Sequence, residues 1–70
     1  MSYFSYHRTA KKLILENKLL YYYLTDDHNG IKPALVLVFN DNIHPIMPIR
    51  IDRFEEYSLI LPKEKFLGKK

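Results

Sequence analysis

The chain has 70 residues, a formal net charge of +3 at pH 7 and no cysteine. A chain of this length forms one domain, and the lack of cysteine excludes a disulfide framework and a thiolate metal site. No apolar run reaches the ~18 residues that a membrane-spanning helix needs, and the first residues do not resemble a secretory signal. We therefore expect residues 1–70 to form a single globular domain from an intracellular, cytoplasmic setting, with no membrane contact.

The charges are distributed unevenly along the chain. Residues 13–62 hold four basic and seven acidic residues, whereas the two ends hold seven basic residues and a single glutamate. Residues 68–70 read as a basic tail, and residues 1–10 as a candidate flexible N-terminal segment. If the fold brought the two ends together, their basic side chains would form a nucleic-acid-binding patch. The candidate residues for that patch are Arg8, Lys11, Lys12, Lys63, Lys65, Lys69 and Lys70.

The first third of the chain fits two structures. In one, a strand covers residues 11–15 and a second strand covers residues 19–25. In the other, an amphipathic helix covers residues 5–24, or only residues 5–15 before the strand. The three consecutive tyrosines and the unbroken apolar run from Leu19 prefer a strand. We therefore predict two strands separated by a turn, and keep the helix as the alternative.

Two segments, residues 19–24 and 34–39, are apolar at successive positions instead of alternating with polar residues. Such segments predict strands that are covered on both faces. The remainder of so short a chain cannot cover two faces of a flat sheet. The sheet must therefore curl into a barrel, be capped by a helix or be covered by another molecule. Tight turns are predicted at residues 26–30, where Asn-Gly favours positive φ, and at residues 40–42.

The remaining residues predict an irregular strand and short helices. Residues 43–51 alternate, but Pro45 and Pro48 lack the N–H groups of a strand interior, so we expect a bent edge strand. Asp52 and Glu55 have the spacing of a capping box at the start of a helix. Residues 59–61 are predicted to form a short closing strand, and residues 63–67 to form a short helix.

These elements predict a mostly β fold, either a small antiparallel meander or an SH3-like barrel, with about four to five strands and one or two short helices. The alternative is an α+β fold, including the ferredoxin-like arrangement, in which an N-terminal helix packs on an antiparallel sheet. In that alternative, the helix over residues 5–15 would cover one apolar face of the sheet.

No motif in the chain specifies a reaction. His7, His28 and His44 do not have the spacing of a zinc site, and no serine lies in a nucleophile elbow. Asp26 and Asp27 are explained by the polar turn, because they do not fit the pattern of a calcium-binding loop. We therefore expect a protein that is not an enzyme and that uses no cofactor, metal or small-molecule substrate.

Tyr21 and Tyr23 are the strongest candidates for a binding surface, because strand alternation places them, together with Leu19, on one face. They can pack in the core, contact a protein partner or stack against nucleic-acid bases. Few basic residues lie near them in the sequence, which favours a protein over a nucleic acid. Arg50 and Arg53 complete the candidate partner-binding residues.

The preferred functional hypothesis is a small protein-binding adaptor or inhibitor that acts on a protein partner or as a homodimer. The alternative is a small β-barrel nucleic-acid-binding protein that uses the tyrosines and the basic ends. The chain is rich in Lys, Ile, Asn, Tyr and Phe, a composition common in proteins from AT-rich genomes. That composition suggests a virus or a mobile element as the source.

Overall fold

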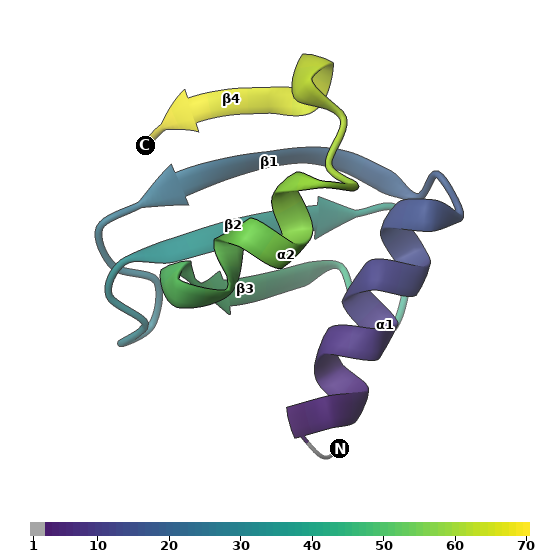
Figure 1. The fold of residues 1–70 in the computed structure, drawn as a ribbon, viewed down its shortest axis with the longest axis horizontal. Helices are drawn as coiled ribbons and strands as arrows, with labels where there is room; N and C mark the ends of the chain where they lie inside the picture. The colour runs from purple at the N-terminus through teal and green to yellow at the C-terminus, as the bar shows by residue number, and fades with distance from the viewer. Residues whose placement is uncertain (1–2) are drawn as a thin grey trace.

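The computed structural model describes residues 3–70, which form a mixed four-stranded sheet with two α-helices on one of its faces (Figure 1). The strand order is β3-β2-β1-β4, and β4 runs parallel to β1 while the other neighbours are antiparallel. In chain order the elements are α1 (Tyr3–Leu15), β1 (Leu19–Thr25), β2 (Ala34–Phe39), β3 (Ile46–Arg50), the 3-10 turn η1 (Ile51–Arg53), α2 (Phe54–Ser58), the 3-10 turn η2 (Lys63–Lys65) and β4 (Phe66–Lys69).

The predicted class, a small β-rich domain of four strands with short helices, is confirmed. Within residues 3–70 the sheet stays open, with β3 and β4 at its two edges, so these residues form no barrel. The arrangement corresponds to the α+β alternative, in which the N-terminal helix packs on the sheet. The parallel pairing of β4 with β1 makes the sheet mixed rather than antiparallel throughout.

The strand predicted at residues 11–15 is wrong, because these residues form the last turns of α1. The helix ends before Asn17, whose positive φ of 62° reverses the chain, as is typical of asparagine after a helix. Because α1 begins at Tyr3, residues 3–10 of the segment considered above are helical, and residues 1 and 2 lie outside the described residues. The buried side chains of α1 share one helix face: His7, Ala10, Leu13 and Ile14.

The strands β1 and β2 have the predicted bounds, and a bulge in β1 decides which of its side chains face the helices. The pairing register shifts between Leu19 and Tyr21, so Leu20 is the extra residue of the bulge. Leu19 and Tyr22 therefore both belong to the core. Strict alternation would place Leu19 on the face of Tyr21 and Tyr23, so that part of the prediction is wrong.

The core lies between the sheet and the two helices. Fully buried Tyr57 of α2 and buried Leu61 after it pack with the buried face of α1. Removing a large apolar side chain from water contributes about 1.5–3 kcal/mol, so this layer holds α1 and α2 on the sheet. On the sheet side, cross-strand neighbours form two rows, Tyr22–Leu37–Met47 and Leu24–Leu35–Ile49.

The two predicted turns on either side of β2 are present. Asp27 accepts a hydrogen bond from the N–H of Gly30 at 2.9 Å, and Asn29 and Gly30 have φ values of 51° and 92°. The carboxylate of Asp41 accepts hydrogen bonds from two following backbone N–H groups, at 3.2 and 2.8 Å. Bonds from side chains to backbone therefore fix the chain at both ends of β2.

The C-terminal half departs from the prediction at three points. Arg53 precedes α2 and no side chain caps this helix, so the capping box predicted from Asp52 and Glu55 is wrong. Residues 59–61 form a turn and a bend instead of a closing strand. The helix predicted at residues 63–67 is limited to η2, and the chain then continues into β4.

Both edge strands are short. β3 occupies only the later part of the strand predicted at residues 43–51 and contains Pro48. β4 contains Gly68, which has a φ of 83°, and the register between β4 and β1 shifts along this pairing. The N–H of Lys70 donates to a β1 carbonyl at 2.7 Å, so the predicted basic tail is bound to the sheet.

Candidate functional site

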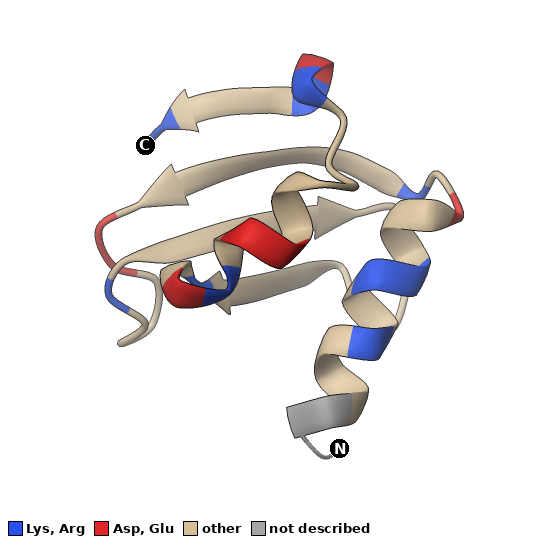
Figure 2. Cartoon of the chain, in the orientation of Figure 1, with Lys and Arg blue, Asp and Glu red and all other residues tan. Residues whose placement is uncertain are grey.

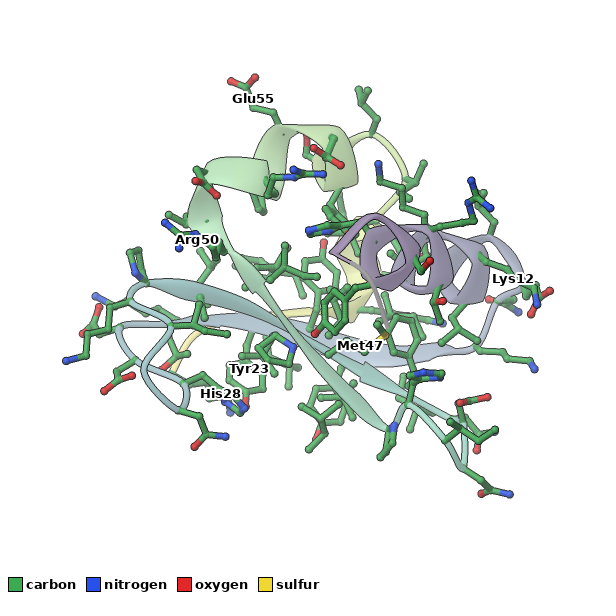
Figure 3. The ribbon with its side chains drawn as sticks, turned by 90° about the horizontal axis from the view of Figure 1, so that it is seen from below. Lys12, Tyr23, His28, Met47, Arg50 and Glu55 are labelled. Atoms are coloured by element: carbon green, nitrogen blue, oxygen red, sulfur yellow. The ribbon has the colours of Figure 1, made fainter. Side chains whose placement is uncertain are left out.

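One face of the sheet carries apolar side chains that neither α1 nor α2 covers. Strand pairing places side chains of β1, β2 and β3 in rows across this face. Figure 3 shows the helices on one side of the sheet and Tyr23 and His28 on the other side. We call this surface the open sheet face, and it consists of Tyr21, Tyr23, Val36, Val38, Ile46 and Pro48.

The open sheet face is exposed at its margins and closely packed at its centre. Tyr21 keeps 38% of its surface exposed, and Ile46 keeps 52%. Val36 lies between Tyr23 and Pro48 in its row and is fully buried, although it does not belong to the core beneath the helices. The open sheet face is therefore closed to water at its centre and accessible at its margins.

The aromatic rings of Tyr21 and Tyr23 stack on one another, with ring centroids 6.4 Å apart and planes 23° from parallel. This contact limits the motion of both rings, and rigid aromatic rings bury much area at a low cost in conformational entropy. The ring of Phe66 in β4 stacks on Tyr22, so Phe66 lies on the helix side of the sheet. Leu67 is the next residue of the strand and is 49% exposed, so its side chain points to the opposite side. Leu67 therefore extends the open sheet face onto the neighbouring strand.

The structure brings together two of the four predicted partner-binding residues, Tyr21 and Tyr23. Arg50 pairs with Ala34 at the end of β3, and its guanidinium is 3.7 Å from Asp52. Arg53 lies on η1 and pairs with Glu56 of α2 at 2.9 Å. Figure 3 shows Arg50 beside η1 and Tyr23 on the side of the sheet away from the helices, so Arg50 does not extend the tyrosine pair.

The basic residues of the two ends do not form one patch. Figure 1 shows the start of α1 and the end of β4 on opposite sides of the molecule, and Figure 2 shows the basic positions of the two ends spread over α1, η2 and the C-terminus. Lys11 pairs with Glu56 at 2.6 Å, Lys69 pairs with Asp26 at 2.9 Å, and Lys65 donates to a β1 carbonyl. Arg8, Lys11 and Lys12 belong to α1, whereas Lys63, Lys65, Lys69 and Lys70 lie in or next to η2 and β4.

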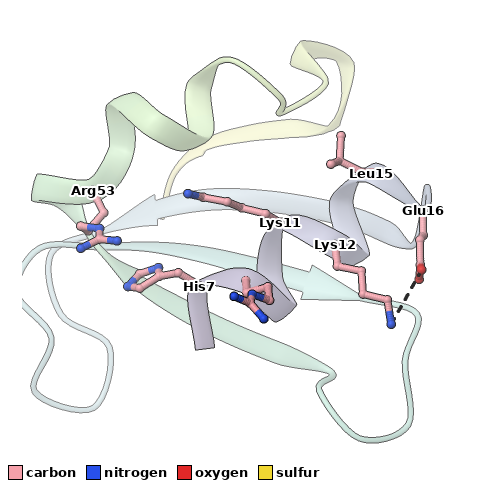
Figure 4. Close-up of a pocket in the computed structure, with 7 residues that line it drawn as sticks. His7, Lys11, Lys12, Leu15, Glu16 and Arg53 are labelled. Carbon is pink, nitrogen blue, oxygen red and sulfur yellow. Dashed lines mark ion pairs between the residues drawn. The ribbon is translucent and has the colours of Figure 1, made fainter. Parts of the chain in front are cut away.

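A groove along α1, which the sequence did not indicate, is a second candidate region (Figure 4). It has a volume of about 800 Å³ and extends along the outer side of α1 to η1. We call it the α1 groove, and its lining residues are His7, Arg8, Lys11, Lys12, Leu15, Glu16 and Arg53. The cationic side chains of the helix thus line a concave surface instead of being spread over a convex one.

A network of hydrogen bonds and ion pairs forms the inner wall of the α1 groove. His7 Nδ1 and the Tyr57 hydroxyl are 2.6 Å apart, and both side chains are buried. Lys11 binds Glu56 at 2.6 Å and lies 5.5 Å from the centre of the Tyr57 ring, while Arg53 binds the same carboxylate at 2.9 Å. Burial lowers the pKa of His7, and the hydrogen bond from Lys11 lowers the pKa of Glu56. His7 is therefore neutral and Glu56 ionised at neutral pH.

The other two histidines belong to turns. His28 exchanges backbone hydrogen bonds with Ile31 at 3.0 Å, and His44 Nδ1 lies 3.5 Å from the Asp41 carboxylate. The hydrogen bond from the backbone N–H of His44, together with the one from Ile43, lowers the pKa of Asp41. Among residues 3–70, no group of three or more His, Cys, Asp or Glu side chains is placed to hold a metal ion.

The chain matches no family model, no curated protein and no solved structure. In the part of the chain that the structure describes, no helix has the length and apolar character needed to cross a bilayer. The class of protein that the structure defines is a small α+β domain with one covered and one open sheet face. Its function is therefore inferred from the open sheet face and the α1 groove.

Proposed function

We propose that this protein is a small non-enzymatic protein-binding module, an adaptor or inhibitor, whose contact surface is the open sheet face. One observation carries the proposal: the sheet is apolar on both faces, and α1 and α2 cover only one of them. A partner that removes this surface from water gains about 25 cal/mol per Å² of apolar area. The proposal includes a cytoplasmic location, because a chain without cysteine needs no oxidising compartment.

The chemistry of the open sheet face favours a protein partner over a nucleic acid. Its two central rows, Tyr21–Val38–Ile46 and Tyr23–Val36–Pro48, hold no charged side chain. Surfaces that stack single-stranded bases combine aromatic rings with a positively charged groove. Stacked tyrosines without neighbouring cations are instead typical of protein interfaces, in which tyrosine is enriched.

The size of the open sheet face suits a small interface. Four strands spaced about 4.8 Å apart span roughly 14 Å between the axes of the outer strands, and a strand of six residues such as β2 is roughly 20 Å long. A partner that covers only this area buries less than the ~1,200 Å² of total surface at which specific stable complexes begin. We therefore expect a transient complex with a partner whose own contact surface is apolar and uncharged.

The test compares the wild-type protein with the variant Tyr21→Ser/Tyr23→Ser. Proteins captured by the immobilised wild type are purified, and their dissociation constants for wild type and variant are measured by isothermal titration calorimetry. We expect binding to weaken at least about tenfold, because truncating each central ring of an interface costs on the order of 1 kcal/mol or more. Leu59→Ser is the matched control, since Leu59 is 87% exposed next to α2 and should bind as wild type.

Several outcomes contradict the proposal. Equal affinity of a purified partner for the wild type and for the double variant would show that the open sheet face is not the contact surface. A large loss of thermal stability in the double variant would show that Tyr21 and Tyr23 act as core residues. Binding of single-stranded DNA or RNA that depends on these tyrosines would favour the nucleic-acid alternative. Light scattering at increasing protein concentration shows whether a second copy is the partner.

A further inference from the structure

The positive charge of the α1 groove is spread along its length. Four of its seven lining side chains are cationic, and one is a carboxylate. Figure 4 shows His7 and Lys11 pointing from α1 toward Arg53, whereas Lys12 and Glu16 lie at the opposite end. Because the cations do not converge on one point, the groove suits a ligand with several separated negative charges better than a single phosphate group.

Ion pairs within the chain position these cations without cancelling the charge of the groove. Lys11 and Arg53 share the carboxylate of Glu56, at 2.6 and 2.9 Å, which fixes both side chains along one wall. Lys12 lies 3.9 Å from Glu16, at the limit of an ion pair, and its side chain is 69% exposed. Such an exposed pair contributes little free energy, so Lys12 can turn toward a ligand at small cost.

We propose that the α1 groove binds an acidic peptide segment of a partner protein. Arg8 and Lys12 are four residues apart on α1, so their charges are spaced about 6 Å along the groove. Carboxylates at positions i and i+4 of a helix, or at alternate positions of an extended chain, have nearly the same spacing. Leu15, one turn beyond Lys12 and 71% exposed, offers a contact for an apolar side chain of the same segment.

The surroundings of the α1 groove favour a peptide over a nucleic acid. Asp52, Glu55 and Glu56 line the surface next to Arg53, so the cations of the groove border on an acidic region. A nucleic acid carries a negative charge at every phosphate and gains affinity by contacting many cations in succession. A nucleic acid that extended past Arg53 would bring its phosphates close to the carboxylates of Asp52, Glu55 and Glu56, which would repel them. A peptide confines its carboxylates to a few side chains and can end before α2.

The experiment is a nuclear magnetic resonance titration of the ¹⁵N-labelled protein with the peptide acetyl-Glu-Ala-Glu-Leu-Glu-Ala-Glu-Leu-amide. We expect saturable shifts of amide signals from α1 and η1, with a dissociation constant below about 1 mM at low salt and weaker binding at higher salt. The variant Arg8→Gln/Lys12→Gln should bind about fivefold more weakly. The control Lys32→Gln/Lys70→Gln removes the same charge outside the groove, so its affinity should change less than about twofold.

Four results overturn this inference. The first is an absence of saturable shifts up to about 1 mM peptide, and the second is equal binding of the matched peptide with glutamine at each glutamate. The third is equal weakening of peptide binding by the two double variants. The fourth is tighter binding of single-stranded oligothymidylate at the same residues. Circular dichroism verifies that each variant is folded. The open sheet face does not contribute to this binding, so Tyr21→Ser/Tyr23→Ser should bind the peptide as wild type does.

Discussion

The substitution Tyr57→Phe tests the polar contact that joins α1 to α2. Tyr57 is fully buried, and its hydroxyl lies 2.6 Å from Nδ1 of His7, which is 6% exposed. In the neutral imidazole, Nδ1 can accept the proton of the phenol. The substitution deletes one oxygen and leaves the ring in the core, so its effect reports on this contact and not on packing.

The structure sets the expected magnitude of the effect. A hydrogen bond contributes about 1 kcal/mol to stability, and depriving a buried polar group of a partner costs about 1–3 kcal/mol. Because His7 has little access to water, we expect the free energy of unfolding to fall by about 1–2 kcal/mol. In a domain of this size each kcal/mol lowers Tm by roughly 4–8 °C, so Tm should fall by roughly 5–15 °C.

Urea denaturation followed by circular dichroism near neutral pH measures the change in free energy. Tyr21→Phe is the matched control, because it removes the same atom from a ring that is 38% exposed on the open sheet face. The control should change the free energy of unfolding by less than about 0.5 kcal/mol. The reasoning is refuted if Tyr57→Phe is as stable as the wild type, or if the control loses as much.

Burial, followed by the charge of Arg53, lowers the pKa of His7 in the folded protein. As the pH falls below ~6.5, His7 of the unfolded chain therefore takes up a proton before His7 of the folded protein does. The free energy of unfolding decreases over this range, until the pH reaches the pKa of the folded state. His7→Leu should flatten this part of the profile of urea midpoint against pH, and an unchanged profile would contradict the assignment. Leu37→Ala should lower the free energy of unfolding by about 3 kcal/mol in the same assay, because Leu37 is fully buried, whereas Leu20→Ala, at 52% exposure, should cost less than about 1 kcal/mol. Gly30→Ala should cost about 1–2 kcal/mol, because a φ of 92° is unfavourable for any side chain; a stability equal to wild type would show that the turn relaxes.

The bounds of β1 and β2 could be predicted from the sequence, because polar turn residues interrupt both apolar runs. The helix α1 could not be distinguished from a strand at residues 13–15, since a short apolar run fits both structures. Its buried face depends on His7, a residue that counts as polar in any pattern. Only the folded structure shows that Tyr57, far away in the sequence, provides the hydrogen bond that allows this burial.

The candidate surfaces were predictable only in part. The apolar positions of β1 and β2 correctly indicated a sheet with apolar residues on both faces, and α1 and α2 cover one of these faces. The bulge at Leu20 and the turn into η1 have no clear sequence signal, yet they decide the faces of Leu19 and Arg53. β4 pairs with β1 across more than forty residues of chain, as the partners Tyr22 and Phe66 show, and no local pattern encodes such a pairing.

Both edges of the sheet carry features that hinder the addition of further strands. Pro48 removes a backbone donor from β3, while β4 has only four residues, a register break and a lysine at its end. The apolar segments in β1 and β2 have the composition of amyloid-forming sequences, but both strands lie in the interior of the sheet. The chain can therefore expose an apolar surface at high concentration while its edges oppose growth into fibrils.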